Sequence, residues 1–495
     1  MTGPVSSYPD DDVFVRELGV QPRLRRGLNL LEAGLLGVAF QGPTAGSIVV
    51  TSAAFAVGGP AFIWVFPVCL VFQAVMALQW GELASQYPIT GGIYQWAKYL
   101  GGEWWGWLTA VLYTACVVIA QPVFGVIVNV VVHGLFPGVA FSTANSVLIA
   151  AALTVLAGLV ICTSVRIVGL LNGAGVVFEL FVLVATTVLL LVRRKQPAGV
   201  IFTTAGVQGH GSYLVPFIVA LALELTLLSG FESAGFFSEE VRRSRRGGPR
   251  AIVLACTATA VFTGLFALAV LLATPKIPAG MAAGASWVPQ TLHAALGTPG
   301  EDTILAAALV ALVSTAIANM GVMTRLIFGM SRDQFLPGSR VLGKVSARSG
   351  EPLYTVLLCV LLSFLPIVII TKITVVVDAE AGLLLATYLI TAGASLPRRL
   401  RGWPARPAPF RLGRWGLPLT IIGLAWTGFA LTVTAWPRNI TNPVFGPTRV
   451  IWEIGGGLIT LAAIAWITRQ RAGPPRSGTA FPPGIAGQGG ATRRQ

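Results

Sequence analysis

Apolar residues occur along the chain in runs of about twenty, and short polar segments separate the runs. Each run is long enough to cross the roughly 30 Å hydrocarbon core of a bilayer as a helix. A membrane barrel would instead show segments of about ten residues that alternate between apolar and polar. The pattern predicts twelve spans, near residues 30–55, 61–84, 104–132, 145–165, 169–192, 212–238, 250–273, 303–329, 353–371, 376–396, 415–436 and 449–468. The loops at 86–103 and 275–300 are amphipathic enough to hold short interfacial helices.

The composition supports this all-α, polytopic membrane fold. Of the 495 residues, 55% are hydrophobic and 11% are charged, against about 25% charged in a soluble domain. The five cysteines stand singly inside apolar runs and the three histidines are scattered. Because neither type clusters at a metal-ligand spacing, we expect no disulfide framework, no metal site and no cofactor.

The net charge of +15 is distributed as in an inner or plasma membrane protein. With the N-terminus in the cytoplasm, 26 of the 34 Lys and Arg residues fall in cytoplasmic segments and 7 fall outside. This bias follows the positive-inside rule, although the three basic residues 193–195 fall outside. Both termini are therefore expected in the cytoplasm. Nucleic acid is not an expected partner, because aromatic residues are not interleaved with the basic ones.

Both ends of the chain differ from the apolar centre. Residues 1–27 are polar and mixed in charge, and we expect a cytoplasmic tail there, with no cleavable signal peptide. Residues 471–495 are rich in Gly and Pro, so they bury too little apolar surface to fold and are expected to be disordered. Residues 28–470 form the expected transport domain.

Two predicted spans contain residues that helices tolerate poorly. The first span has Gly, Pro and small polar residues over 40–47, and the sixth has Ser229, Gly230 and Gly235 at a similar depth. If spans one to five and six to ten form two halves, each half begins with a broken helix. Paired breaks of this kind indicate a secondary transporter built from inverted repeats. The alternative is close helix packing, which also favours small residues.

The breaks suggest a binding site for a zwitterion. An unwound stretch frees backbone groups that lipid cannot satisfy, so they must line a polar cavity. The half-helix after the first break would present its positive N-terminus to a substrate carboxylate. Free carbonyl groups near Ser229, Gly230 and Phe231 would suit an ammonium group.

Four motifs in consistent order resemble the amino acid–polyamine–organocation superfamily of permeases. They are GELASQYPITGGIY at 81–94, NGAGVVFE at 172–179, GFESAGFFSEEVRRSRRGGPRAIV at 230–253 and SRDQFLP at 331–337. The first two are most similar to the amino acid/choline and 4-aminobutyrate permease branch. The resemblance covers about residues 28–470, and this sequence differs from many relatives in having Gly42-Pro43 just before the first break.

The resemblance implies a leucine-transporter-type fold with a five-plus-five inverted repeat and two extra helices. Repeat one would cover 28–192, repeat two 212–396 and the extra helices 415–468. The implied substrate contacts are Thr44, Ala45 and Gly46 at the carboxylate, and Ser229, Gly230 and Phe231 at the amine, with the Phe231 ring as a thin gate. Side chains of spans three, eight and ten would select the substrate; the candidates are Tyr113, Ser314, Asn319 and Tyr388.

A charge inside a span costs at least about 2.5–3.5 kcal/mol, and of the carboxyl groups within predicted spans three qualify best as functional residues. In proton-coupled relatives, the position that matches Glu179 looks like the place where a lysine replaces a sodium ion. A carboxylic acid stands there in this chain, which makes Glu179 a candidate proton carrier; the alternative is a structural hydrogen bond. Glu232 could bind the amine or relay a proton, or else cap the second half-helix. Glu224 has a weaker case. Outside the spans, Glu239 and Glu240 are expected to pair with the arginines at 242–246.

The leading functional hypothesis is a secondary active transporter for a small amine or amino acid, coupled to protons. An amine exchanger and a polyamine or choline carrier are the alternatives within transport. An enzyme is disfavoured because the chain lacks the HExxH and GxSxG motifs and a cytosolic catalytic domain. A primary pump would need a phosphate-binding loop, which is also missing. A sensor that does not transport would keep the same broken helices. The expected partners are the substrate, protons and membrane lipid.

Overall fold

The computed structural model describes residues 9–136, 138–139, 142–207, 211–369, 373–404, 408–435 and 449–471. In these ranges the chain is helical and forms no β-strand. The spans are α2 (Leu30–Gln41) with α3 (Pro43–Gly58), α4 (Val65–Gln86), α6 (Glu103–Leu135), α7 (Thr143–Ile161), α8 (Val165–Val192), α9 (Leu214–Leu227) with the 3-10 helix η3 (Phe231–Phe237), α10 (Ser244–Ala273), α12 (Trp287–Arg332), α14 (Leu353–Ile369), α15 (Ile373–Leu400), α16 (Gly416–Ala435) and α17 (Arg449–Arg471). The short helices are α1 (Pro9–Glu17), η1 (Pro60–Trp64), α5 (Ile93–Gly101), η2 (Ala198–Phe202), α11 (Ile277–Ala282), η4 (Gly284–Ser286), α13 (Ser339–Leu342) and η5 (Gly413–Trp415).

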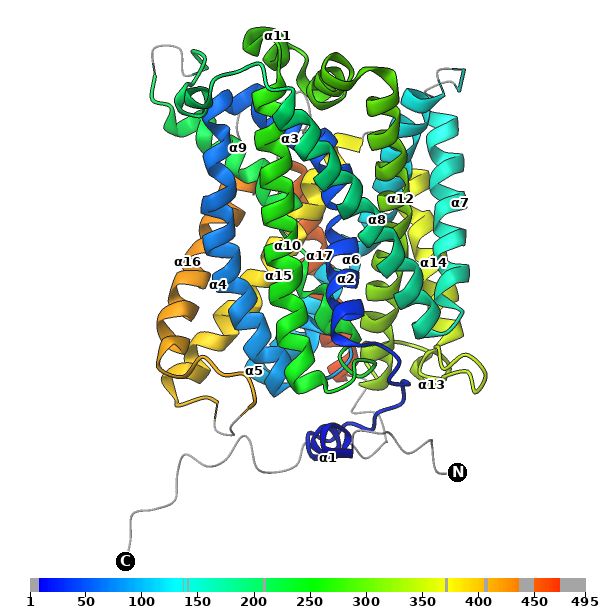
Figure 1. Cartoon of the computed structure of the whole chain (residues 1–495). Helices are drawn as coiled ribbons and strands as arrows, with labels where there is room; N and C mark the ends of the chain where they lie inside the picture. Colours follow the sequence, from blue (N-terminus) through cyan, green and yellow to red (C-terminus); the bar gives the residue numbers. More distant parts are fainter. Residues whose placement is uncertain are drawn as a thin grey trace, which may run out of the picture.

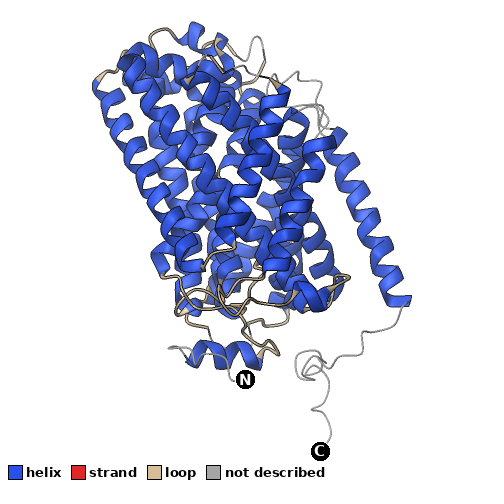
Figure 2. Ribbon diagram, turned by 90° about the vertical axis from the view of Figure 1, so that its right-hand side faces the viewer, coloured by secondary structure: helices blue, strands red, loops and turns tan. Residues whose placement is uncertain are grey.

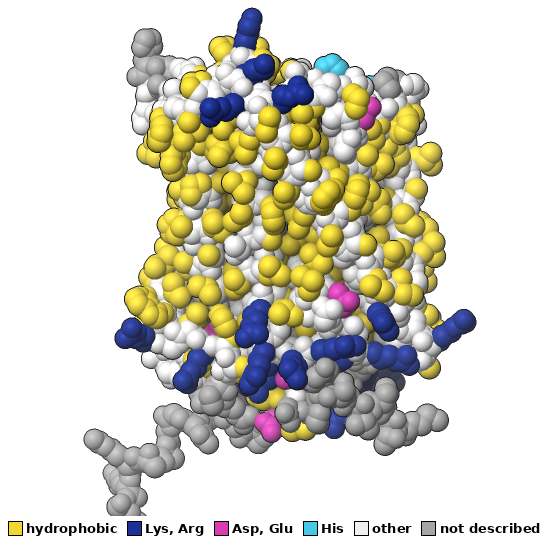
Figure 3. Space-filling view, viewed as in Figure 1, with side chains coloured by type: hydrophobic (Ala, Val, Ile, Leu, Met, Phe, Trp, Pro, Cys, Tyr) yellow, Lys and Arg dark blue, Asp and Glu magenta, His cyan; other side chains and the backbone are white. Residues whose placement is uncertain are grey.

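The long helices stand side by side in one bundle (Figures 1 and 2). All twelve predicted positions hold a helix or a broken pair, and among the described residues ten segments are long and apolar enough to cross a membrane. Figure 3 shows a belt of hydrophobic side chains around the middle of the molecule, with Lys and Arg gathered at its two ends. Exposed side chains such as Leu148 and Phe181, each 69% accessible, contribute to this surface. Such a belt suits lipid as its solvent.

The breaks set the arrangement of the bundle centre. The outer half-helices of the first and sixth spans, α3 and α9, pack against each other, while α4 packs along α10 and α6 lies against α12 and α15. Buried apolar residues of all these helices form one continuous cluster. The short helix α5 lies at the lower end in Figure 1 and α11 at the upper end. Two helices meet within α12 at Gly297, whose φ of 72° is not helical. The part after this kink holds the predicted span 303–329, and the part before it lies in the segment 275–300, where a short helix is predicted.

The N-terminal segment is partly built into the fold. Residues 9–17 form α1 beneath the lower end of the bundle (Figure 1). The Arg26 guanidinium bonds the Asp12 carboxylate at 2.6 Å and the carbonyl of Val241 at 2.7 Å. Val15 is fully buried against the loop that holds Ile89. The segment expected as a polar tail therefore contains a packed helix, whereas the expected C-terminal tail lies, from residue 472 on, outside the described residues.

Candidate functional site

The first break is a single left-handed residue. Gly42 has φ 59° and ψ 59°, a backbone conformation that a side chain would strain, and it ends α2. Pro43 then starts α3, where its missing N–H costs no hydrogen bond. The Gly42-Pro43 pair, which sets this chain apart from many relatives, thus makes the turn itself. A Cβ at Gly42 would also approach the Thr315 hydroxyl to 2.8 Å, so the turn lies against α12.

Glu179 of α8 occupies the N-terminus of α3. The Thr44 N–H donates to Glu179 Oε1 at 2.8 Å, and both residues are fully buried. The positive end of a helix stabilises an anion there. The sequence analysis expected a substrate carboxylate at this place, and in the structure a carboxylate of the protein holds it. The Thr44 hydroxyl also lies beside the carboxyl group, and no other partner of Glu179 Oε2 is found among the described residues.

The next two residues of α3 pack against apolar neighbours. Ala45 is 5% exposed. A Cβ on Gly46 would lie 2.1 Å from Leu227 Cδ1, so any larger residue here would force the Leu227 side chain of α9 to move. In this conformation Gly46 is a packing residue of the two outer half-helices.

The second break is stabilised from neighbouring helices. Gly230 has φ 96°, and its N–H donates to the Tyr388 hydroxyl at 3.0 Å. Gln73 of α4 donates to the carbonyl of Leu228 at 3.2 Å and to Ser229 Oγ at 3.0 Å. The carbonyl of Gly230 accepts from the N–H of Ser233 at 3.0 Å. Three of the backbone groups freed here are therefore satisfied by the protein. Sequence analysis missed Gln73, although an amide within an apolar span was a visible signal.

Glu232 is held between two tyrosines. Tyr113 of α6 donates to Glu232 Oε1 at 2.7 Å, and the Tyr388 hydroxyl of α15 bonds Oε2. The Phe231 ring is fully buried, with its centroid 6.1 Å from that of Tyr388. Two of the four candidate side chains of spans three, eight and ten thus meet at one predicted site residue.

The other two candidates serve different contacts. Asn319 Nδ2 donates to the carbonyl of Val117 at 2.9 Å and to Gln121 Oε1 at 2.7 Å, so it joins α12 to α6. Ser314 lies against α8, where a Cβ on Gly175 would meet its hydroxyl at 2.3 Å.

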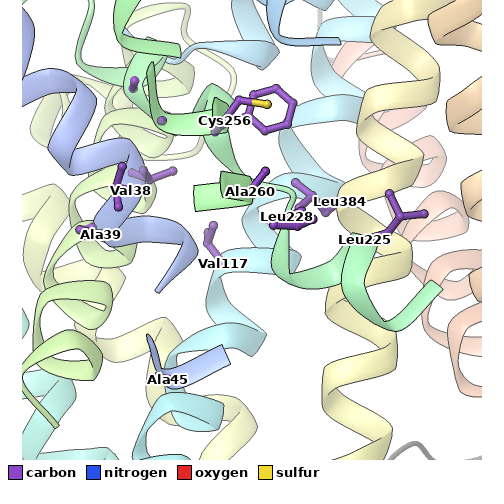
Figure 4. Packing of buried hydrophobic residues seen from close by; sticks show 14 of the residues in the cluster. Val38, Ala39, Ala45, Val117, Leu225, Leu228, Cys256, Ala260 and Leu384 are labelled. Carbon is purple, nitrogen blue, oxygen red and sulfur yellow. The ribbon is translucent and has the colours of Figure 1, made fainter. Parts of the chain in front are cut away.

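Buried apolar side chains that flank the breaks in sequence pack together with those of neighbouring helices (Figure 4). They come from six helices that the chain brings together, and their effect is to exclude water from the two carboxyl groups and so strengthen every polar contact there. The labelled residues are Val38, Ala39, Ala45, Val117, Leu225, Leu228, Cys256, Ala260 and Leu384. Among the described residues no group of three or more His, Cys, Asp or Glu could hold a metal ion.

The lower end of the bundle is closed by ion pairs that the sequence analysis assigned to the wrong partners. Glu239 pairs with Arg332 at 2.6 Å rather than with the neighbouring arginines of its own loop. Glu240 and Glu351 both pair with Arg325, at 2.7 and 2.9 Å, and all three side chains are about 1% exposed. Glu239 and Glu240 pair with residues far away in sequence because α12 brings Arg325 and Arg332 to their loop.

A further pair joins α5 to the end of α12. Lys98 Nζ lies 2.8 Å from Asp333 Oδ2, which also accepts from Gln95 at 3.0 Å and from the Tyr94 hydroxyl. Burial disfavours the charged Asp333 carboxylate, but the Lys98 and Arg332 charges outweigh this and lower its pKa below the ordinary value. The neighbouring positive charges therefore favour the charged form of the Asp333 carboxylate.

Comparison with known proteins agrees with the geometry. A family model described as amino acid permease matches residues 34–479. The amino-acid permease BAT1 of Arabidopsis thaliana is 23% identical over 93% of this chain and 94% of its own length. Its homologue in Oryza sativa is 24% identical, covering 92% of this chain and 93% of the relative. An uncharacterised amino-acid permease of Schizosaccharomyces pombe is 23% identical over 89% and 84%.

Proposed function

Given that the chain belongs to the amino acid permease family and is an amino acid transporter, we propose that it works by proton symport with alternating access. The observation that carries this proposal is the Glu179 carboxylate on the N-terminus of α3. A substrate carboxylate that binds there must compete with a charge already present. Protonation of Glu179 removes this competition, because a neutral acid no longer repels an incoming anion. Substrate and proton would then bind together.

We propose that the substrate lies between the two breaks. Its carboxylate would approach the first turn of α3 at Thr44, Ala45 and Gly46. Its amine would approach Ser229, Gly230 and the Glu232 carboxylate, with the buried Phe231 ring over the site. Glu232 is a second coupling candidate, since an ammonium group would compete with the two phenols that now bond it. The side chains of this proposed site are buried here, which fits an occluded conformation.

The same proposal includes a topology in the cell or inner membrane. The ion-paired lower end, which carries α1, would face the cytoplasm with both termini, as the distribution of Lys and Arg favours. An inverted repeat would relate spans one to five to spans six to ten. Its support is that α5 and α11, which follow the second span of each half, lie at opposite ends in Figure 1.

Uptake by the purified protein in proteoliposomes tests this function. The labelled panel would contain 4-aminobutyrate, neutral and cationic amino acids, choline and putrescine, with and without an inward proton gradient. Proton symport predicts accumulation that follows the gradient in the wild type. Glu179→Gln should lose this accumulation while counterflow of the same substrate survives. Uptake that ignores the gradient and requires internal substrate would instead establish an exchanger and remove Glu179 from coupling.

A further inference from the structure

Glu224 is a buried acid that the proposed transport site does not use. It lies in α9, two turns before Glu232, and its side chain is fully buried. Its polar neighbour is the Thr51 hydroxyl of α3, which interacts with the carboxyl group. No other hydrogen-bond partner of either carboxyl oxygen is found among the described residues. An acid supported by one hydroxyl group thus lies inside a hydrocarbon environment.

No basic residue is placed to neutralise this acid. The elements packed against α9 are chiefly α3, α4, α16 and η1. Of these, α3, α16 and η1 contain no charged residue. The one charged residue of α4 is Glu82, which lies thirteen residues beyond Cys69 and pairs with Arg399. The remaining titratable neighbours are the thiol of Cys69, which lies near Glu224, and that of Cys256, which lies near Cys69.

An ionised carboxylate in these surroundings is strongly disfavoured. A charge at the centre of a bilayer costs at least about 2.5–3.5 kcal/mol even when water and lipid adjust around it. Here Thr51, Cys69 and Glu224 are all fully buried, so a metal ion or an ammonium group would need room that the packed side chains occupy. A proton is the one cation that needs no additional volume.

We propose that Glu224 is a proton-binding site of the transporter, distinct from the two helix breaks. It binds a proton while α3 and α9 are packed together as they are here. It releases the proton when these half-helices separate and water reaches the carboxyl group. Figure 1 shows both half-helices in the upper part of the bundle, toward the end that carries α11. The role in transport rests on the proposed function, whereas the protonation itself does not.

The direction of the linkage follows from the two states. The closed arrangement binds one more proton than the open one, so acid on the upper side favours closure. One linked proton changes the closed-to-open ratio by up to tenfold per pH unit, over the range in which the open form is ionised and the closed form is protonated. Glu224→Gln carries a permanently neutral group of the same shape. In that variant, closure at this end no longer depends on pH.

Infrared spectroscopy of the reconstituted protein tests the protonation without any transport. The C=O stretch of a carboxylic acid is separate from amide and carboxylate absorption. At neutral pH we expect the wild type to show one more buried carboxylic acid than Glu224→Gln. A difference spectrum that instead loses a carboxylate band would overturn the proposal. Thr226→Val, in the same helix and half-buried, controls for disturbance of α9 and should leave the acid bands unchanged.

The transport role is tested by counterflow at varied external pH with equal substrate on both sides. Wild type should slow as the external pH rises, and Glu224→Gln should keep its acid-side rate. Thr51→Val retains the carboxyl group, so it should keep a pH dependence with a displaced midpoint, even if Glu224→Gln folds poorly. Identical profiles for wild type and Glu224→Gln would refute the role. If wild type shows no proton-driven uptake at all, the symport proposal fails, and the infrared result still decides the protonation of Glu224.

Discussion

The two helix breaks are both met by a glutamate, yet the two carboxyl groups are held in different ways. Glu179 reaches the first break from α8, where its Oε1 accepts from the Thr44 N–H and the hydroxyl of the same residue lies beside the carboxyl group. Glu232 belongs to the broken span itself, and each of its oxygens bonds a tyrosine. The first carboxyl group is thus held by one residue and the second by two. A group held by one residue can change partners during a cycle, whereas a group held from two helices fixes geometry.

The difference also concerns what replaces each group. At the first break a substrate anion must replace Glu179 as the acceptor of the Thr44 N–H, and any hydrogen-bond acceptor can do so. At the second break a substrate amine must draw Glu232 away from Tyr113 and Tyr388, or share it with them. We therefore interpret Glu179 as the group that senses the proton and Glu232 as the group that recognises the amine.

The largest effect is expected from Glu232→Gln. The amide keeps one oxygen acceptor, but its NH₂ group faces a phenol that needs an acceptor. Hydrogen bonds to charged groups contribute about 1.5–3 kcal/mol, so substrate affinity should fall about 10- to 100-fold. Equilibrium binding of the transported substrate measures this loss. Glu103→Gln, at an exposed position of α6, should bind as the wild type does. Unchanged binding in Glu232→Gln would remove the amine-recognition role.

Gly46→Ala tests the contact between the half-helices above the breaks. The added methyl would lie 2.1 Å from Leu227 Cδ1, and such overpacking costs about 1–3 kcal/mol. The melting temperature in detergent should fall. Leu227→Ala makes room for the methyl, so the double variant should be more stable than the sum of the single effects predicts. Simple additivity would mean that the two residues are not in contact, and that Gly46 is conformationally rather than sterically constrained.

Much of the fold could be predicted because hydropathy and the bilayer thickness act locally along the chain. Both breaks were visible as Gly and small polar residues within apolar runs, and Gly42 and Gly230 do take left-handed conformations. The positions of Glu179 and Glu232 in spans also follow from the sequence. What could not be predicted was partner choice, which depends on how helices far apart in sequence face one another.

One error illustrates this limit. Glu239 and Glu240 are predicted to pair with the arginines at 242–246, two to seven residues away, but they pair with Arg332 and Arg325 of α12. Proximity in sequence is a poor guide here because α12 brings its arginines to the loop. Similarly, no local pattern indicates that Glu179, 135 residues after Thr44, accepts from the Thr44 N–H.

Glu179→Gln and Glu179→Leu separate the structural from the chemical role of this residue. Glutamine keeps an oxygen that can accept from the Thr44 N–H, so the melting temperature should stay close to that of the wild type. Leucine leaves a buried N–H without a partner, which costs about 1–3 kcal/mol. Thermal unfolding in detergent should therefore rank glutamine above leucine. Equal stability of the two variants would show that the Thr44 bond contributes little and would weaken the contrast between the breaks.

The finest distinction lies between the two tyrosines of the second break. Tyr113→Phe removes one donor to Glu232, whereas Tyr388→Phe removes a donor and also the acceptor of the Gly230 N–H. Leaving one more buried N–H without an acceptor costs about 1 kcal/mol, which corresponds to roughly a fivefold difference in affinity. Substrate binding should therefore weaken more in Tyr388→Phe than in Tyr113→Phe, and the melting temperatures should follow the same order. Tyr354→Phe, at an exposed position of α14, provides the control, since its hydroxyl lies away from both breaks. The reverse order would mean that Tyr113, from α6, carries the recognition of the amine and that the Tyr388–Gly230 bond is dispensable for shaping the break.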